Sequence, residues 1–394
     1  MKTHHKVTGK KFQVIKIQAL VLCCLLVFFS CTKENKKTDH DYPRVATELV
    51  TNINANGATF NGLFLSAGKC EIIDHGFVFD MYDLPNTQRS EKISLGASNG
   101  SGSFTSMANF GMELGKTYYV SAYAQNKENI FYAQPVNFIS MGSISPEIHA
   151  IVPSEGVRGD TVLIKGKYFS QQPLNNSVKF GDVVTSVIKT SDTALTVFVP
   201  SSNGWELADV FVTTAGKIAQ KINGFQYLKP VITNLSPIQS VIGDTIAITG
   251  KYFRPDMEIK FNQVKARIYR AGYTSARAII PACSSVSANI LVTADGLTTA
   301  YEQKFTYAQP EITGLSTNQG VIDDTITIYG KNFGYLKNVV FVFFGEQPAT
   351  VLYVNNSSIE VIVPASGGKT SLAVTVRVDG QIAEGYQMFS YTNQ

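Results

Sequence analysis

The chain is poor in the residues from which catalytic and metal sites are usually built. Its 394 residues include five cysteines, five histidines and one tryptophan, and charged residues make up 16%. Outside the first 31 residues the histidines are His40, His75 and His149, which stand at unrelated positions. We therefore expect surface or edge roles for them, and neither a metal cluster nor a catalytic triad. No acidic calcium loop or phosphate-binding glycine loop occurs. The composition argues against an enzyme and predicts no cofactor and no metal.

Cysteine usage argues against a disulfide-stabilised fold. Cys23, Cys24 and Cys31 all lie in the first 31 residues, which leaves Cys70 and Cys283 in the remainder of the chain. These two stand in different expected domains, so we expect no disulfide between them. A free cysteine behaves as a small apolar residue, and buried positions are expected for both.

The first 31 residues have the pattern of a targeting segment. Five lysines are followed by an apolar run from Ala19 to Phe29 and then by Ser30 and Cys31. The apolar run is too short to span a bilayer comfortably. Because a cysteine follows the small residue, residues 1–30 resemble a bacterial lipoprotein signal peptide, which implies that Cys31 carries lipid such as palmitate. An ordinary signal peptide or a retained anchor is the alternative.

Residues 31–42 form a polar tether with no apolar face, which predicts flexibility. Lys33 and Glu34, directly after Cys31, loosely resemble the surface-export signal of Bacteroidota lipoproteins. The resemblance implies lipid attachment to the outer membrane, facing outward rather than the periplasm.

Net charge excludes one class of partner. The formal charge is +4, but the five lysines of the leader supply all of it, and the chain after the leader is near −1. A nucleic-acid groove needs clustered Lys and Arg, which the remaining sequence lacks. We therefore predict no nucleic-acid partner.

One short phrase occurs three times after residue 150. It reads GDTVLIKGKYF at 159–169, GDTIAITGKYF at 243–253 and DDTITIYGKNF at 323–333. The phrases begin 84 and then 80 residues apart. A nearly constant spacing of about 80 residues indicates tandem copies of one small domain. Each copy opens on a proline and closes on a Phe-x-Tyr strand, so the copies span 146–228, 230–308 and 310–394. Only two residues separate the closing tyrosine of one copy from the opening proline of the next, which favours a semi-rigid rod.

Each copy has the pattern of a small β-sandwich. Aliphatic residues alternate with polar ones in the repeated phrase, glycines and prolines punctuate every run, and about seven short strands fit into each copy. Gly166, Gly250 and Gly330 are expected to let the chain bend sharply. The phenylalanine three residues after each glycine is expected to fill the core. The sequence predicts an all-β chain of tandem immunoglobulin-like sandwiches.

These landmarks resemble those of the IPT/TIG family of immunoglobulin-like domains. The family pattern runs from Pro-x-Ile through Gly-x-x-Val/Ile-x-Ile-x-Gly-x-x-Phe to a closing Phe-x-Tyr. The third copy departs from it at Asp323, where the other copies have glycine, and at Thr317, where they have proline. The resemblance implies three such domains over 146–394.

Residues 43–140 form a different expected sandwich. The stretch MELGKTYYVSAYAQN at 112–126 resembles the end of a fibronectin type III domain. The resemblance implies that the Tyr118 hydroxyl bonds to nearby backbone. With HGFVFD near 75–80, the stretch looks like the variant found in Bacteroidota surface lipoproteins. The four domains together predict a stalk of roughly 140 Å.

Two aromatic features stand out as possible binding sites. Trp205 lies in the polar stretch SSNGWELAD, where an indole could stack on a sugar or anchor a protein partner, or could instead cover the end of the sandwich. The aromatic strand VVFVFFG at 339–345 is interpreted as core plus one edge position rather than as a platform.

An Asp-Thr pair followed by an aliphatic or small residue occurs four times. It resembles the O-glycosylation sequon of exported Bacteroidota proteins, which implies modification at Thr161, Thr193, Thr245 and Thr325. The alternative is structural, because Gly-Asp-Thr also makes a good turn into a strand.

The leading functional hypothesis follows from the resemblance to Bacteroidota surface glycan-binding proteins that accompany TonB-dependent importers. It implies a non-catalytic lipoprotein that holds polysaccharide near an outer-membrane transporter, with Trp205 as the candidate contact. The alternative is a protein-interaction, scaffold or adhesin subunit of an outer-membrane complex.

Overall fold

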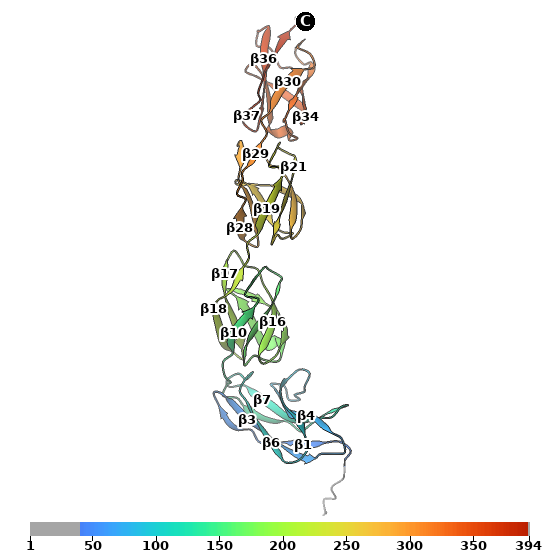
Figure 1. Ribbon diagram of the computed structural model, residues 1–394, viewed down its shortest axis with the longest axis vertical. Coiled ribbons are helices and arrows are strands. Elements are labelled where there is room, and N and C mark those ends of the chain that lie inside the picture. The colour runs from blue at the N-terminus through green and yellow to red at the C-terminus, as the bar shows by residue number, and fades with distance from the viewer. Residues whose placement is uncertain (1–39, 393–394) are drawn as a thin grey trace, which may run out of the picture.

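The computed structural model describes residues 40–392. Figure 1 shows four β-sandwiches in chain order, with the three copies stacked end to end and the first domain lying crosswise at their N-terminal end. Within 40–392 the helical segments are two 3₁₀ turns, η1 (Pro173–Asn175) and η2 (Lys337–Val339), and no helix is long and apolar enough to cross a membrane. The all-β prediction is confirmed, and the leader with Cys31 lies outside the described residues.

The first domain consists of two packed sheets. One sheet has the order β1-β3-β2 with β6 on β3, and the other has the order β5-β4-β7-β8 with β9 on β7. The strands are β1 (Arg44–Thr47), β2 (Thr51–Asn54), β3 (Gly57–Ser66), β4 (Ile72–Asp80), β5 (Glu91–Ser98), β6 (Ser103–Ala108), β7 (Thr117–Gln125), β8 (Ile130–Tyr132) and β9 (Val136–Ile139).

The predicted hydroxyl contact of Tyr118 is present in this domain. The hydroxyl donates to the carbonyl oxygen of Gly111 at 3.1 Å and accepts from the backbone nitrogen of Glu113 at 3.1 Å. Burial raises the pKa of Tyr118 to about 12, so the hydroxyl keeps its proton at neutral pH.

The first copy also has two sheets, with the orders β10-β12-β16-β15 and β11-β18-β17-β13-β14. Its strands are β10 (Glu147–Val152), β11 (Glu155–Gly156), β12 (Thr161–Lys167), β13 (Asn176–Phe180), β14 (Val183–Thr185), β15 (Val187–Thr190), β16 (Ala194–Phe198), β17 (Leu207–Thr214) and β18 (Lys217–Tyr227).

The second copy repeats this plan, with its second layer divided into two short sheets. The orders are β19-β21-β25-β24, β20-β29-β26 and β23-β22-β27-β28. The strands are β19 (Val231–Ser236), β20 (Gln239–Ser240), β21 (Thr245–Lys251), β22 (Glu258–Phe261), β23 (Val264–Lys265), β24 (Arg267–Ala271), β25 (Ser275–Ile279), β26 (Ser287–Ala288), β27 (Ile290–Ala294), β28 (Leu297–Ala300) and β29 (Phe305–Tyr307).

The third copy differs from the other two in one long strand, β34, which pairs with a strand of each layer. The order is β30-β32-β35-β34-β33-β36-β38-β31, with β37 on β36. The strands are β30 (Glu311–Leu315), β31 (Gln319–Gly320), β32 (Thr325–Lys331), β33 (Val340–Phe344), β34 (Gln347–Asn355), β35 (Ser358–Ile362), β36 (Ser371–Val378), β37 (Gln381–Ile382) and β38 (Gln387–Tyr391). The nine-residue β34 takes the place of two short strands in each of the other copies.

The cores follow the predicted alternation. The alternating aliphatic residues of the repeated phrase, such as Val162 and Ile164, are buried. The phenylalanines that follow each glycine are buried too, and they are Phe169, Phe253 and Phe333. In each copy the closing Phe-x-Tyr strand places its phenylalanine edge-to-face against the last phenylalanine of β13, β22 or β33, as Phe180 and Phe225 show at 5.2 Å between centroids. Such pairs add about 0.5–1.5 kcal/mol to the free energy of burial.

The glycine of the phrase has a different role from the one predicted. Gly250 lies inside β21 with an extended backbone, and a Cβ added there would stand 2.0 Å from the carbonyl oxygen of Val231 and 2.4 Å from the Phe253 ring. The glycine therefore permits close approach of the neighbouring strand and of the Phe253 ring. The bend follows two residues later, at Tyr252, whose φ is 60°.

The junction between the first and second copies is fixed by one carboxylate. Asp295 stands in the β27–β28 turn of the second copy, and it accepts from the Ser201 hydroxyl at 2.8 Å and from the Ser202 backbone nitrogen at 2.7 Å. Arg158 of the first copy adds an ion pair to Asp256 of the second at 2.5 Å. Directional contacts across a two-residue linker favour the semi-rigid stacking seen in Figure 1.

The next junction uses the equivalent carboxylate. Asp379, in the β36–β37 turn of the third copy, accepts from the backbone nitrogens of Cys283 at 2.8 Å and Ser284 at 2.6 Å. Buried apolar side chains of the second and third copies form one continuous cluster. The same device therefore joins both pairs of neighbouring copies.

The junction to the first domain is built differently. The turn position equivalent to Asp295 is Ala215, which has no carboxylate to offer. Here the buried Glu91 of the first domain accepts from the Ser170 hydroxyl and from the Gln171 backbone nitrogen, the latter at 2.9 Å. Burial raises the pKa of Glu91, which these donors partly offset.

Candidate functional site

The described residues contain no cluster of three or more His, Cys, Asp or Glu side chains arranged to hold a metal ion. His75 is buried, contrary to the expected surface role: its ring contacts Phe64 and Phe104, and its Nδ1 lies 2.7 Å from the Gly96 carbonyl oxygen. His149 is exposed and lies 3.0 Å from the Glu147 carboxylate.

The two cysteines of the described chain are both free, which agrees with the prediction of no disulfide. Cys70 is exposed, so its expected burial was wrong. Cys283 is half-buried, and its Sγ lies 3.1 Å from the Tyr307 hydroxyl at the second junction. Neither thiol stands beside a base that would activate it.

Trp205 lies in the loop before β17, at the junction of the first and second copies. Its side chain is 64% exposed, so it does not cover the end of the sandwich. Its neighbour Gly204 lies against Gly296 of the second copy, and Glu206 forms an ion pair with Lys229 at 2.7 Å. The indole stands on a well-held loop and is free to contact a ligand, and its role as a binding residue stays a prediction.

The Asp-Thr pairs lie in turns that lead into strands or next to them. The Asp160 carboxylate accepts from the Val157 backbone nitrogen at 2.9 Å, and Asp324 does the same for Val321 at 2.8 Å. These contacts account for the aspartate without any modification. Thr161, Thr193 and Thr325 are exposed and Thr245 is half-buried. O-glycosylation stays a prediction, and an intact mass equal to peptide plus lipid would refute it.

A cleft of about 710 Å³ separates the first domain from the first copy. Tyr82 on one wall is 66% exposed and carries the Arg89 guanidinium over its ring, at 5.5 Å from the centroid. Leu174 on the other wall is 99% exposed. No sequence pattern indicated this cleft, because its walls come from two domains.

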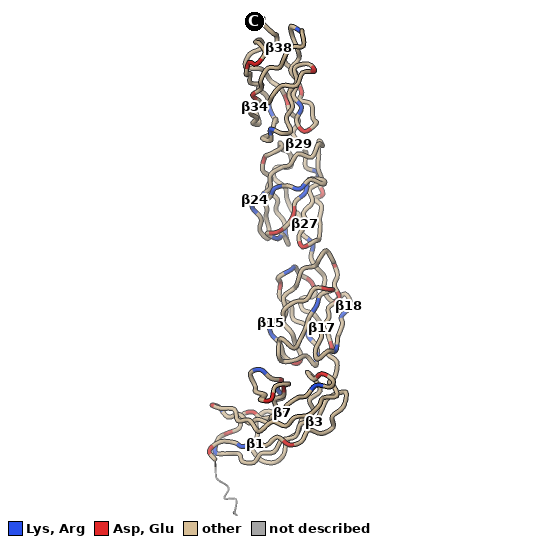
Figure 2. The backbone as a smooth tube through the Cα atoms, turned by 180° about the vertical axis from the view of Figure 1, so that it is seen from behind, with Lys and Arg blue, Asp and Glu red and all other residues tan. Residues whose placement is uncertain are grey.

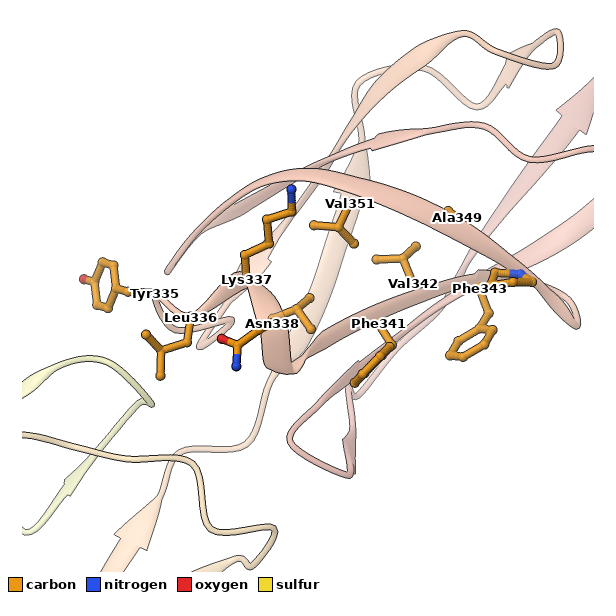
Figure 3. Close-up of a pocket in the computed structure, with 11 residues that line it drawn as sticks. Tyr335, Leu336, Lys337, Asn338, Phe341, Val342, Phe343, Ala349 and Val351 are labelled. Carbon is orange, nitrogen blue, oxygen red and sulfur yellow. The ribbon is translucent and has the colours of Figure 1, made fainter. Parts of the chain in front are cut away.

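A second concave site lies on the third copy and has a volume of about 520 Å³. Figure 3 shows its lining, which comes from the Tyr335–Asn338 segment, from β33 and from the first half of β34. The first half of β34 pairs with β33 and contributes Pro348, Ala349 and Val351 to the lining. Lys337 and Asn338 supply the polar groups, and none of the lining residues is acidic.

Strand β33 presents two aromatic rings outward instead of the single edge residue that was predicted. Val340, Val342 and Phe344 are buried, whereas Phe341 is 52% exposed and Phe343 is half-buried. Both outward rings line the concave site of the third copy, which is the groove drawn in Figure 3. The interpretation of 339–345 as core plus one edge position therefore needs correction.

A basic side chain lies over this aromatic surface. Arg377 pairs with Phe341 across β33 and β36, and its guanidinium lies 6.0 Å from the centroid of the Phe343 ring. An arginine over an aromatic face contributes about 0.5–1 kcal/mol at exposed sites. It also adds positive charge beside the Phe343 ring.

The other copies show that the fold does not require these rings. The two outward positions of the equivalent strand are Ser177 and Lys179 in the first copy, and Glu258 and Lys260 in the second. A phenylalanine that stays exposed on a sheet face forgoes about 25 cal/mol of burial free energy for every Å² of apolar surface left in water. A departure of this kind from the repeat is the signal that could have found the site from sequence.

Flat aromatic surface beside hydrogen-bonding groups suits a ligand with one apolar and one polar side. The C–H face of a pyranose can lie on a phenyl ring while its hydroxyls reach Asn338 and Arg377. The combination of aromatic faces and hydrogen-bonding groups supports reversible binding.

One known domain family matches three segments of this chain. The family model described as IPT/TIG domain matches residues 146–227, 230–307 and 310–391, together more than half of the chain. Fibrocystin-L from Mus musculus is 23% identical over 275 residues, which cover 65% of this chain and 6% of that protein. The chain thus spans less than a tenth of the length of this curated relative.

Among solved structures, surface glycan-binding protein PbSGBP-B from Prevotella bryantii has 11% identity and a TM-score of 0.25, covering 63% of this chain and 85% of that one. A Bacteroides ovatus SGBP-B from a mixed-linkage glucan utilization locus, solved with a heptasaccharide, has 13% identity and a TM-score of 0.20. There the match covers 61% of this chain and 65% of the other. From its three matched domains, this chain belongs to the IPT/TIG domain family.

Proposed function

We propose that this chain is a non-catalytic surface lipoprotein of the outer membrane, and that it holds polysaccharide for a TonB-dependent importer. Phe341 and Phe343 carry the proposal, because they place aromatic faces outward at two positions that are polar in the other copies. The resemblance of the first 31 residues to a lipoprotein leader supports the anchoring.

The shape of the chain supports capture at a distance from the membrane. A lipid on Cys31 would hold the N-terminal end, and Figure 1 places the third copy at the opposite end of the rod. The groove with Phe341 and Phe343 would then meet polysaccharide first, and Trp205 would offer a second contact lower on the rod. Capture needs only reversible stacking and hydrogen bonding, and no bond is broken.

Replacing both outward rings by the residues of the first copy, in the variant F341S/F343K, is expected to weaken polysaccharide binding at least about tenfold. Two stacking contacts of about 1 kcal/mol each, within the usual range for aromatic contacts, would together give about thirtyfold. Affinity electrophoresis of residues 32–394 across a panel of neutral and acidic polysaccharides measures the effect. Trp205→Ala is run beside it to test the loop.

Tyr386→Ser is the matched control, since Tyr386 is an exposed aromatic residue of the third copy that lies outside the groove. The control is expected to run like the wild type. Retardation that survives in F341S/F343K but disappears in Trp205→Ala would move the site to the first copy. Unchanged retardation in both variants would remove both candidate sites.

A protein-interaction role is the second candidate, and the cleft beside the first domain favours it. Leu174 and Tyr82 face solvent on opposite walls there, as apolar anchors of protein interfaces do. This reading expects a co-purifying outer-membrane partner that is lost on Leu174→Asp, and no retardation by any polysaccharide.

A further inference from the structure

The outer face of the second copy carries a group of exposed arginines. Arg267 and Arg270 lie on β24 and Arg277 lies on the adjacent β25. Arg270 and Arg277 are direct cross-strand partners, in the region where β24 is irregular between Ile268 and Arg270. Two guanidinium groups are therefore held side by side by the register of the sheet.

These charges have no partner among residues 40–392. None of the three arginines forms an ion pair or a side-chain hydrogen bond in this part of the chain. Glu258 is occupied by Lys260 and Lys265, each at 2.9 Å. Like charges directly opposite each other on a sheet are destabilising. The pair thus costs stability in the free protein, and a bound anion would relieve that cost.

The surface around the pair is flat and accessible. On the other side of Arg277 lies Ala247 of β21, and the next outward positions are Thr249 and Ser275. Tyr269, on the same strand as Arg270, is exposed. Short side chains leave both guanidinium groups open to a ligand that lies along the sheet.

The other copies again show that the fold does not demand this pair. The positions equivalent to Arg270 and Arg277 are Lys189 and Thr196 in the first copy, which are paired in the same register. In the third copy they are Tyr353 and Glu360. A like-charge pair stands in the second copy alone among the three.

We propose that this arginine face binds the carboxylate or sulfate groups of an acidic polysaccharide. The inference rests on the proposed function, which it narrows to an anionic substrate class. Planar guanidinium groups match such anions in a two-point geometry. Arg377 and Lys337, at the groove of the third copy, carry the same sign of charge.

The arginine face and the groove lie on different layers of their sandwiches. Strand β24 is the counterpart of the second half of β34, and Figure 2 draws both labels on the same side of the rod. Arg270 and Arg277 face outward from the sheet of β21, β25 and β24, whereas Phe341 and Phe343 face outward from the sheet of β33 and β36. The arginine face is therefore tested as an anion site of its own.

The test uses residues 32–394, with polygalacturonate and chondroitin sulfate as acidic probes and a neutral glucan panel beside them. The variant R270T/R277T is expected to bind the acidic probe at least tenfold more weakly and to lose most of the salt dependence of binding. Without ligand it should melt at the same temperature as the wild type or higher, because the repulsion is gone. The matched control K165T/K189T removes two exposed lysines from the equivalent sheet of the first copy and should bind within twofold of the wild type.

Three results would overturn the inference. Wild-type protein that binds neither acidic probe would do so, and retention of neutral glucans in that experiment would leave the proposed function standing. Equal binding by R270T/R277T and wild type would remove the arginine face from the site. Equal retention of double-stranded DNA and polygalacturonate would show a general response to polyanions.

Discussion

Replacing Gly330 by alanine should lower the free energy of unfolding of the third copy by about 3 kcal/mol or more. A Cβ there would stand 2.1 Å from the Glu311 carbonyl oxygen and 2.1 Å from the Phe333 ring. The carbonyl belongs to a paired strand and the ring fills the core, so neither can move without breaking other contacts. Overpacking at rigid sites typically costs 1–3 kcal/mol and can cost more.

Gly314→Ala is the matched control for this substitution. Gly314 lies on the adjacent strand β30, and no atom lies within 4 Å of its added Cβ. Its replacement should be neutral or slightly stabilising, because alanine reduces the freedom of the unfolded chain. Urea unfolding of both variants measures the difference. Equal stability of the two would show that close packing at Gly330 does not explain the repeated glycine.

Asp379→Ala should uncouple the third copy from the second. The substitution removes the acceptor of the half-buried Cys283 nitrogen and of the exposed Ser284 nitrogen, and each lost hydrogen bond costs about 0.5–1.5 kcal/mol. Small-angle scattering should show a shorter maximum dimension and a broader distribution of shapes. Proteolysis at the linker Ala308–Gln309 should become faster.

The control for this junction is Asp182→Ala, which removes an exposed aspartate from a turn of the first copy. Its scattering curve should match that of the wild type. The equivalent substitution Asp295→Ala should bend the rod at the other junction. A rod that keeps its length in Asp379→Ala would assign the coupling to the shared apolar cluster instead.

Features that depend on local pattern could be predicted from the sequence. Alternation in the repeated phrase gave the buried faces, and the three-fold repeat gave the tandem domains. The position of Phe253 after its glycine indicated a core plug, and the structure buries it completely. These inferences need only the period of a strand and the spacing of the repeats.

Features that depend on contacts between residues far apart in the sequence could not be predicted in this way. The role of Gly250 is set by Val231, which pairs with the strand end some twenty residues away in sequence. The pairing of Arg270 with Arg277 depends on an irregularity in β24 that strict alternation does not contain. The groove is lined jointly by the Tyr335–Asn338 segment, β33 and β34, and their packing depends on pairing that local pattern does not contain.

The crosswise first domain has a comparable origin. The turn aspartate that joins later copies is Ala215 in the first copy, and the junction is made instead by Glu91 from the preceding domain. The sequence of either partner alone does not show this exchange. Comparing equivalent turn positions across the copies would have indicated that the first junction differs.

Binding of a fluorescent polysaccharide to intact cells that produce the chain tests the central claim most directly. Cells with wild-type protein should retain the polysaccharide that retards the purified chain, and protease shaving should abolish retention. Cells with F341S/F343K at equal surface amount should retain at least about tenfold less, for the stacking reason given above. Retention that is equal in both, or that protease leaves untouched, would contradict surface capture by the third copy.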